Sequence, residues 1–195
     1  TLRKTALKLI EDPDPSVRLQ AAQSLGASNA PEITAALASA AAQYGNERWM
    51  SAAILSSAAT RAVPLIEALL PLTEANPSVM EVLPPLATTA AAQGGVTEVH
   101  RVLALAEDNA TPPVQVALLD GLAEGLAHAN PETPTDDQEF DALVRLLSAD
   151  EAEVRERAIR LAGLLRLGDS PVMQTAWAEA EKTALDAERP LEERV

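Results

Sequence analysis

The side chains in this sequence that could carry chemistry are few and stand far apart. The two histidines are His100 and His128, and only His128 has an acid at a helical spacing, Glu124 four residues before it. One imidazole and one carboxylate do not complete a zinc site, which takes four ligands. We interpret both histidines as surface residues. The sequence also gives no argument for bringing a serine, a histidine and an aspartate together as a catalytic triad.

An acidic run, DDQEFD at residues 136–141, resembles a calcium-binding loop in composition alone. It lacks the alternating ligand spacing and the glycine at the sixth position of such a loop. Acids also suit the first turn of a helix, where the helix dipole favours negative charge. The chain has no cysteine, which excludes disulfides and thiolate catalysis. We therefore predict no catalytic residues, no metal site and no cofactor.

Two arginines occupy equivalent places in two related segments, DPDPSVRLQAA and DEAEVRERA. Arg18 follows Asp12 and Asp14 of the preceding turn, and Arg155 follows Asp150 in the same way. A guanidinium can bind two carboxylate or carbonyl oxygens at once, which a lysine cannot match. We expect both arginines to bind the turn before their own helix or that of a neighbour. The alternative is a solvated side chain that contributes almost nothing, as most exposed ion pairs do.

The two tryptophans, Trp49 and Trp177, are the candidate contact residues for a partner. Trp49 aligns with the valine of the Arg18 segment, so we interpret it as a core residue. Trp177 shares a helical stripe with Met173, Ala180 and Ala184, which indicates the same role. Either would become the leading contact residue if it were exposed, because tryptophan is enriched among binding hot spots.

The start of the Arg18 segment recurs along the whole chain. Equivalent positions follow one another at intervals of 30 to 40 residues, namely Val17, Trp49, Val79, Val114, Val154 and Leu191. Such a period is the signature of a helical solenoid. We expect Val17, Val79, Val114, Val154 and Trp49 to be buried between helices.

Composition supports this assignment and limits the possible partners. Hydrophobic residues make up 47% of the chain and aromatic residues 2%, and alanine and leucine dominate, which favours closely packed helices. The net charge is −14, and Arg48, Arg61 and Arg101 are the only basic residues between Gln20 and Thr135, so nucleic-acid binding is not expected. No run of about 20 apolar residues could insert into a membrane. The expected partner is a protein, either a separate one or another domain of the same chain.

The predicted fold class is all-α, an α-α superhelix of about eleven helices in antiparallel pairs. We expect kinks at Pro71 and at Pro84–Pro85, and a break at Gly94–Gly95. Residues 1–195 are interpreted as a single solenoid with a possible minor break at 130–136, and as a fragment of a longer protein. The expected pairs are 1–11 with 15–26, 31–43 with 47–59, 63–75 with 77–93, 96–108 with 112–129 and 138–148 with 151–167, and a sixth opens with 171–187.

The pattern D-P-x-x-x-V-R followed by small apolar residues resembles the HEAT repeat. It reads Asp12 to Arg18 and then Ala21-Ala22, and again Asp150 to Arg155 and then Ala158. The resemblance implies a non-enzymatic interaction scaffold or interdomain connector, in which aspartate and arginine form a ladder across neighbouring repeats. The middle repeats depart from the pattern, because they read Trp49-Met50, Val79-Met80 and Val114-Gln115 where Val-Arg is expected.

A narrower resemblance rests on ERWMSAAILSSAATRA, VQVALLDGLAEGLA and PLEERV. These segments are similar to the HEAT region of large envelope proteins from planctomycete and verrucomicrobial bacteria. In that family a sugar-dehydrogenase-like propeller precedes the repeats and a c-type cytochrome domain often follows. The resemblance implies a connector between redox modules in the periplasm or cell envelope. The alternative is an enzyme on a HEAT-like fold, similar to a bilin lyase or a DNA glycosylase, which the acidic charge and the lack of a catalytic cluster disfavour.

Overall fold

The computed structural model describes residues 2–28, 30–129 and 140–167, together with 174, 177 and 178. Every regular element in these residues is a helix, so the predicted all-α class is confirmed. The expected loop at 130–136, the helix at 171–187 and the closing PLEERV lie outside the described residues. The α-helices are α1 (Leu2–Leu9), α2 (Pro15–Leu25), α3 (Pro31–Tyr44), α4 (Arg48–Ser57), α5 (Ala62–Leu69), α6 (Leu83–Asn109), α7 (Pro112–His128), α8 (Asp141–Leu147) and α9 (Ala152–Leu164), and two 3-10 helices are η1 (Leu70–Leu72) and η2 (Pro77–Glu81).

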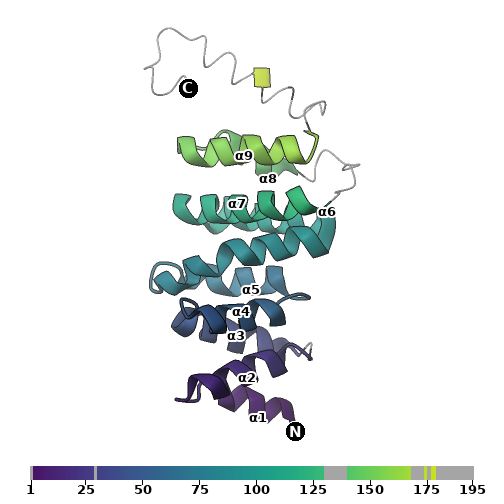
Figure 1. Cartoon of the computed structure of the whole chain (residues 1–195). Coiled ribbons are helices and arrows are strands. Elements are labelled where there is room, and N and C mark those ends of the chain that lie inside the picture. The colour runs from purple at the N-terminus through teal and green to yellow at the C-terminus, as the bar shows by residue number, and fades with distance from the viewer. Residues whose placement is uncertain (1, 29, 130–139, 168–173, 175–176, 179–195) are drawn as a thin grey trace.

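The helices stack pair upon pair from α1 at one end to α9 at the other, as Figure 1 shows. Second helices of successive pairs pack on one another, as α2 does on α4 and α7 on α9. First helices do the same, as α3 does on α5. This two-layered stack is the predicted helical-repeat superhelix. One of its surfaces is formed by the first helices of the pairs and the other by the second helices.

Both expected kinks are helix boundaries instead. Pro84 and Pro85 lie in the first turn of α6, and the residues before them form the separate 3-10 helix η2. Proline suits a first turn, because its missing N–H would have no partner inside the helix there. Pro71 lies in η1, which follows directly on α5, so that helix ends earlier than predicted.

The expected break at the two glycines is present. Gly95 has φ 64° and ψ −161°, which divides α6 into two helical halves. A positive φ is readily adopted by glycine and disfavoured for residues with a side chain. The first half belongs to the third pair and the second half opens the fourth.

Most of the recurring valines are buried as predicted. Val79, Val114 and Val154 are enclosed between helices. Val17 is only half-buried, because it faces the open end of the first pair.

The prediction for Trp49 was wrong. Its side chain is 70% exposed, whereas that of the next residue, Met50, is 3% exposed. The reason is the start of α4, whose N-cap residue is Glu47. In α7 and α9 the third residue after the N-cap is the buried one, namely Val114 and Val154, and in α4 that position falls on Met50. A shift of one residue turns a side chain by about 100° around a helix, which places Trp49 in solvent.

Candidate protein-interaction surface

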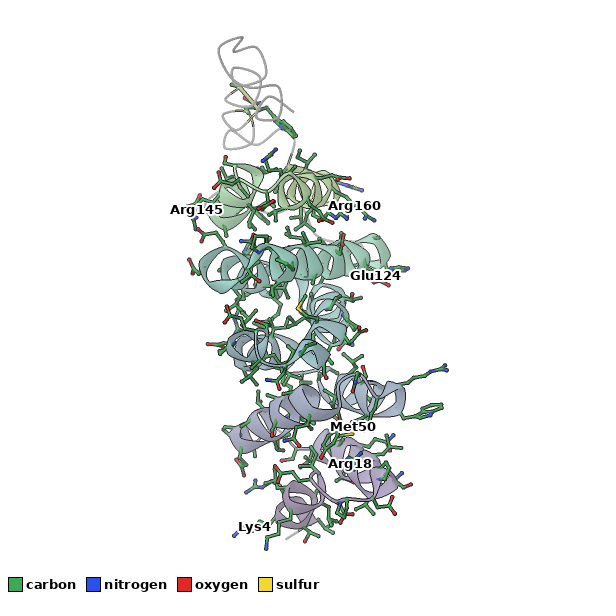
Figure 2. All side chains as sticks on the ribbon, turned by 90° about the vertical axis from the view of Figure 1, so that its left-hand side faces the viewer. Lys4, Arg18, Met50, Glu124, Arg145 and Arg160 are labelled. Atoms are coloured by element: carbon green, nitrogen blue, oxygen red, sulfur yellow. The ribbon has the colours of Figure 1, made fainter. Side chains whose placement is uncertain are left out.

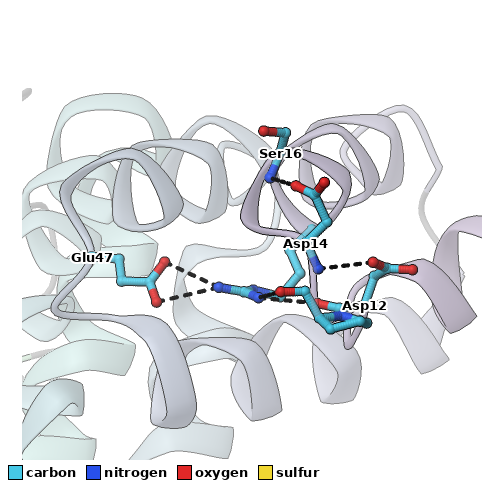
Figure 3. A network of polar contacts seen from close by, with 6 residues as sticks. Asp12, Asp14, Ser16 and Glu47 are labelled. Carbon is cyan, nitrogen blue, oxygen red and sulfur yellow. Dashed lines mark hydrogen bonds and ion pairs between the residues drawn. The ribbon is translucent and has the colours of Figure 1, made fainter.

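The buried guanidinium of Arg18 makes contacts through both of its terminal nitrogens at the junction of the first two repeats (Figure 3). Its Nη1 donates to the carbonyl oxygens of Asp12 at 3.0 Å and Pro13 at 3.1 Å. Its Nη2 lies 3.3 Å from both carboxylate oxygens of Glu47. The guanidinium also stacks on the Tyr44 ring, 4.0 Å from its centroid. The side chain therefore joins its own turn to the second repeat.

The two acids of that turn have a different role from the one expected of ladder carboxylates. The Asp12 carboxylate accepts from the backbone N–H of Asp14 at 2.9 Å. The Asp14 carboxylate accepts from the backbone N–H of Ser16 at 2.8 Å and caps α2. Both acids thus hold the turn in shape, and the carboxylate that binds Arg18 comes from Glu47 in the next repeat.

Arg155 makes the same contacts with backbone carbonyl oxygens as Arg18. Its Nη1 donates to the carbonyl oxygens of Ala149 and Asp150, both at 2.8 Å. These acceptors stand six and five residues before the arginine, as Asp12 and Pro13 do before Arg18. The two arginines bind equivalent turns, and Arg155 is half-buried.

Other polar links between helices were missed from the sequence. Gln115 occupies the arginine position of its repeat, and its side-chain amide donates to the carbonyl of Ala106 at 3.1 Å. Ser57 donates to the buried carbonyl of Ala22 at 2.8 Å. Arg61 is buried and donates to the carbonyl of Ser28. The sequence signal for Arg61 was its position in a stretch with few charges.

Ion pairs between repeats lie toward the two ends of the described stack. Arg3 pairs with Glu32 at 3.2 Å, and Arg157 with Asp120 at 3.3 Å. Arg145 approaches Glu107 to 2.8 Å. Its hydrogen bond lowers the pKa of the Glu107 carboxyl below the ordinary value.

The middle of the stack is held by close helix contact. A Cβ atom added to Gly121 of α7 would lie 2.2 Å from the carbonyl oxygen of Pro84, and one added to Gly125 would lie 2.5 Å from that of Thr88. Glycine lets the backbones of α6 and α7 approach to this distance. Packing of small residues thus joins these repeats, in keeping with their low charge.

The most exposed large apolar side chain on the described second helices is that of Trp49, at 70%. It lies in the first turn of α4, and the guanidinium of Arg48 lies 5.4 Å from its ring centroid. Trp177 is also exposed, at 42%. Both tryptophans therefore meet the condition under which we expected them to be contact residues.

Charge is unevenly distributed over this layer. Among the described second helices from α2 to α7, the arginines are Arg18, which is buried, and Arg48, which is exposed. Toward α9 the surface carries many charges, and Figure 2 shows Glu124 and Arg160 on the side opposite Arg145. Trp49 and Arg48 therefore form an isolated aromatic and cationic site on a nearly uncharged surface.

Among the residues that the structure describes, no three histidine or acidic side chains gather as a metal site. None of the helices described is long and apolar enough to span a bilayer.

The paired helices, the two layers and the turn-binding arginines define an α-solenoid. Residues 3–81 match the family of HEAT repeats, which supports a HEAT-repeat protein. The matched segment contains the Arg18 network and Trp49. No curated protein and no solved structure matches the chain.

Proposed function

We propose that this chain is a non-enzymatic HEAT-repeat scaffold that binds a protein through its second helices, with Trp49 as the central contact. The observation that carries the proposal is the 70% exposure of Trp49 beside Arg48. HEAT repeats commonly mediate protein interactions, which makes a protein the expected class of partner.

The chemistry of the site indicates what the partner presents. An indole offers a large, rigid apolar face, and its burial against a partner yields much binding energy at a small entropic cost. Arg48 would bind a carboxylate beside it, because no other exposed cation competes on the described second helices from α2 to α7. We therefore expect a partner segment with an apolar side chain next to an acid.

A finer form of the proposal places the chain between redox modules of a bacterial envelope protein. It rests on the likeness of three segments to the HEAT region of such proteins, two of which include Trp49 and α7. In that case the partner of Trp49 would be a dehydrogenase-like or cytochrome domain of the same polypeptide. The sequences that flank this segment in its gene test this form directly.

Site-specific photo-crosslinking in cells of the source organism tests the proposal. A photoreactive phenylalanine analogue replaces Trp49 in one variant and Ala35, an exposed residue of α3, in the matched control. We expect a discrete adduct with one protein or domain at position 49 and none at position 35. The proposal is wrong if position 49 yields no adduct, or the same adducts as position 35.

A further inference from the structure

The two edges of the stack differ in charge. The connections inside the helix pairs lie on one edge, and the connections between pairs lie on the other (Figure 1). In the first three pairs, the connections inside them are residues 10–14, 45–47 and 73–82, which contain six acids and no lysine or arginine. The connections that follow these pairs, residues 26–30, 58–61 and 94–95, contain no acid. We call the first edge the acidic edge, and its acids are Glu11, Asp12, Asp14, Glu47, Glu74 and Glu81.

The acidic edge runs past the start of α4, whose first turn carries Trp49. Arg18 binds backbone carbonyl oxygens of the first connection and the carboxylate of Glu47 in the second. A Cβ atom added to Gly45 in the second connection would lie 2.7 Å from the carbonyl oxygen of Ser78 in the third. The three connections are therefore neighbours in space, and the proposed contact residue lies beside the middle one.

Few cations balance these acids. Among the described residues, Glu47 is the only one of the six that forms an ion pair, and its partner Arg18 is buried. Asp14 and Glu81, in the connections on either side, are exposed. Arg48 is the one exposed cation of α4. A protein that approaches the start of α4 therefore meets a single positive charge with carboxylates on both sides of it.

This charge pattern narrows the chemistry of the partner. Opposite charges across an interface accelerate association and favour it, whereas like charges placed opposite each other cost affinity. An acidic segment would be attracted by Arg48 and repelled by the acidic edge. A segment with one acid among several basic residues is attracted by both.

We propose that the segment bound at Trp49 is basic, with one acid that pairs with Arg48, one apolar side chain that covers the indole, and flanking lysines or arginines that lie over the acidic edge. The basic character rests on the proposed role of Trp49 as the central contact. It adds the sign of the partner's charge to that role, and it predicts association that slows as salt is added, because salt screens exposed charges.

Mass spectrometry of the adduct formed at position 49 tests the proposal, because it identifies the cross-linked segment of the partner. We expect an acid beside the cross-linked residue and a net positive charge over the residues on either side of it. A segment with zero or negative net charge would overturn the basic partner and leave the contact at Trp49 standing. The absence of any adduct would overturn both.

A charge reversal in the protein provides the matched comparison. The probe is a synthetic peptide with the sequence of the cross-linked segment, titrated into the 195-residue chain carrying Trp177→Phe, so that the fluorescence of Trp49 reports binding. Glu81→Lys should weaken binding about threefold to tenfold at low salt, and the difference should shrink at high salt. Glu67→Lys makes the same charge change at an exposed position of α5 and should bind like the parent. Circular dichroism establishes that both variants are folded. Equal affinities of the two variants, or a loss in Glu81→Lys that salt does not reduce, would overturn the proposal.

Discussion

Arg18 and Glu47 join the first two repeats, with the Nη2 atom of the arginine 3.3 Å from each carboxylate oxygen of the glutamate. Glu47 is also the N-cap residue of α4. The arginine of one second helix thus binds the residue at which the next second helix begins. Arg18 is 7% exposed, whereas the side chain of Glu47 is 47% exposed, so solvent screens this pair from the glutamate side while the arginine itself is buried.

Arg18→Lys should lower the free energy of unfolding by about 1 to 3 kcal/mol, because a lysine cannot bind the turn carbonyls and Glu47 together. Arg155→Lys should cost less, since Arg155 is half-buried. Urea denaturation of the variants measures both effects.

The controls for these two substitutions are Arg48→Lys and Arg101→Lys. Arg101 makes an exposed pair with Glu98 on its own helix, and Arg48 lies over an exposed ring. Neither change should shift the urea midpoint. Equal stability of all four variants would show that the turn-binding arginines contribute nothing.

Truncation should destabilise the protein at Met50 and leave its stability nearly unchanged at Trp49. Met50→Ala removes an enclosed side chain and should cost about 2 to 5 kcal/mol of stability. Trp49→Ala removes a mostly solvated one and should stay within about 0.5 kcal/mol of the wild type. Thermal melts of the two variants measure the difference. A larger loss of stability in Trp49→Ala would show that Trp49 belongs to the core.

Gly121→Ala should destabilise the junction of α6 and α7. The new Cβ would lie 2.2 Å from a backbone carbonyl oxygen, which cannot move without displacing α6. We expect a loss of about 1 to 3 kcal/mol from this overpacking. Gly163→Ala on α9 is the control, because nothing lies within 4 Å of its Cβ position. That variant should gain about 0.5 to 1 kcal/mol from helix propensity.

Near Arg145, the pKa of Glu107 should lie below its ordinary value and the pKa of Asp108 above its ordinary value. The hydrogen bond from Arg145 lowers the pKa of Glu107, and the hydrogen bond with Glu107 raises the pKa of Asp108. A lowered pKa in the folded state means that the Glu107 contribution to stability is present above its ordinary pKa. It is lost as the pH falls through the lowered value.

Arg145→Gln removes the main cause of the lowered Glu107 pKa, so that pKa should rise toward the ordinary value. Carbon-detected NMR titration of the carboxyl groups measures it. An unchanged Glu107 pKa in the variant would show that Arg145 is not the cause.

Helix positions could be predicted from the sequence because local signals mark them. The turn Asp12 to Pro15 and the paired glycines at 94 and 95 act through their own backbone preferences. The second helices α7 and α9 were also aligned correctly, with Val114 and Val154 as their buried residues. Trp49 was misplaced because a single position decides which side chain faces inward. The N-cap of α4 stands two residues before Trp49, whereas the N-caps of α7 and α9 stand three residues before Val114 and Val154.

The contacts between repeats could be predicted only in part. The position of Arg18 before a turn is visible in the sequence, but its carboxylate partner stands 29 residues away at Glu47. Arg61 stands in a stretch with few charges, but nothing local identifies the carbonyl of Ser28 in a preceding repeat as its acceptor. These contacts depend on how one pair of helices lies on the next, which the repeat pattern does not specify.

Acrylamide quenching of tryptophan fluorescence in a Trp177→Phe variant tests the central claim that Trp49 is displayed for binding and does not belong to the core. Trp49 is then the remaining tryptophan in the chain. We predict an emission maximum close to that of an indole in water, with quenching nearly as efficient as for the free amino acid. A blue-shifted emission that acrylamide scarcely quenches in the monomeric protein would contradict the account.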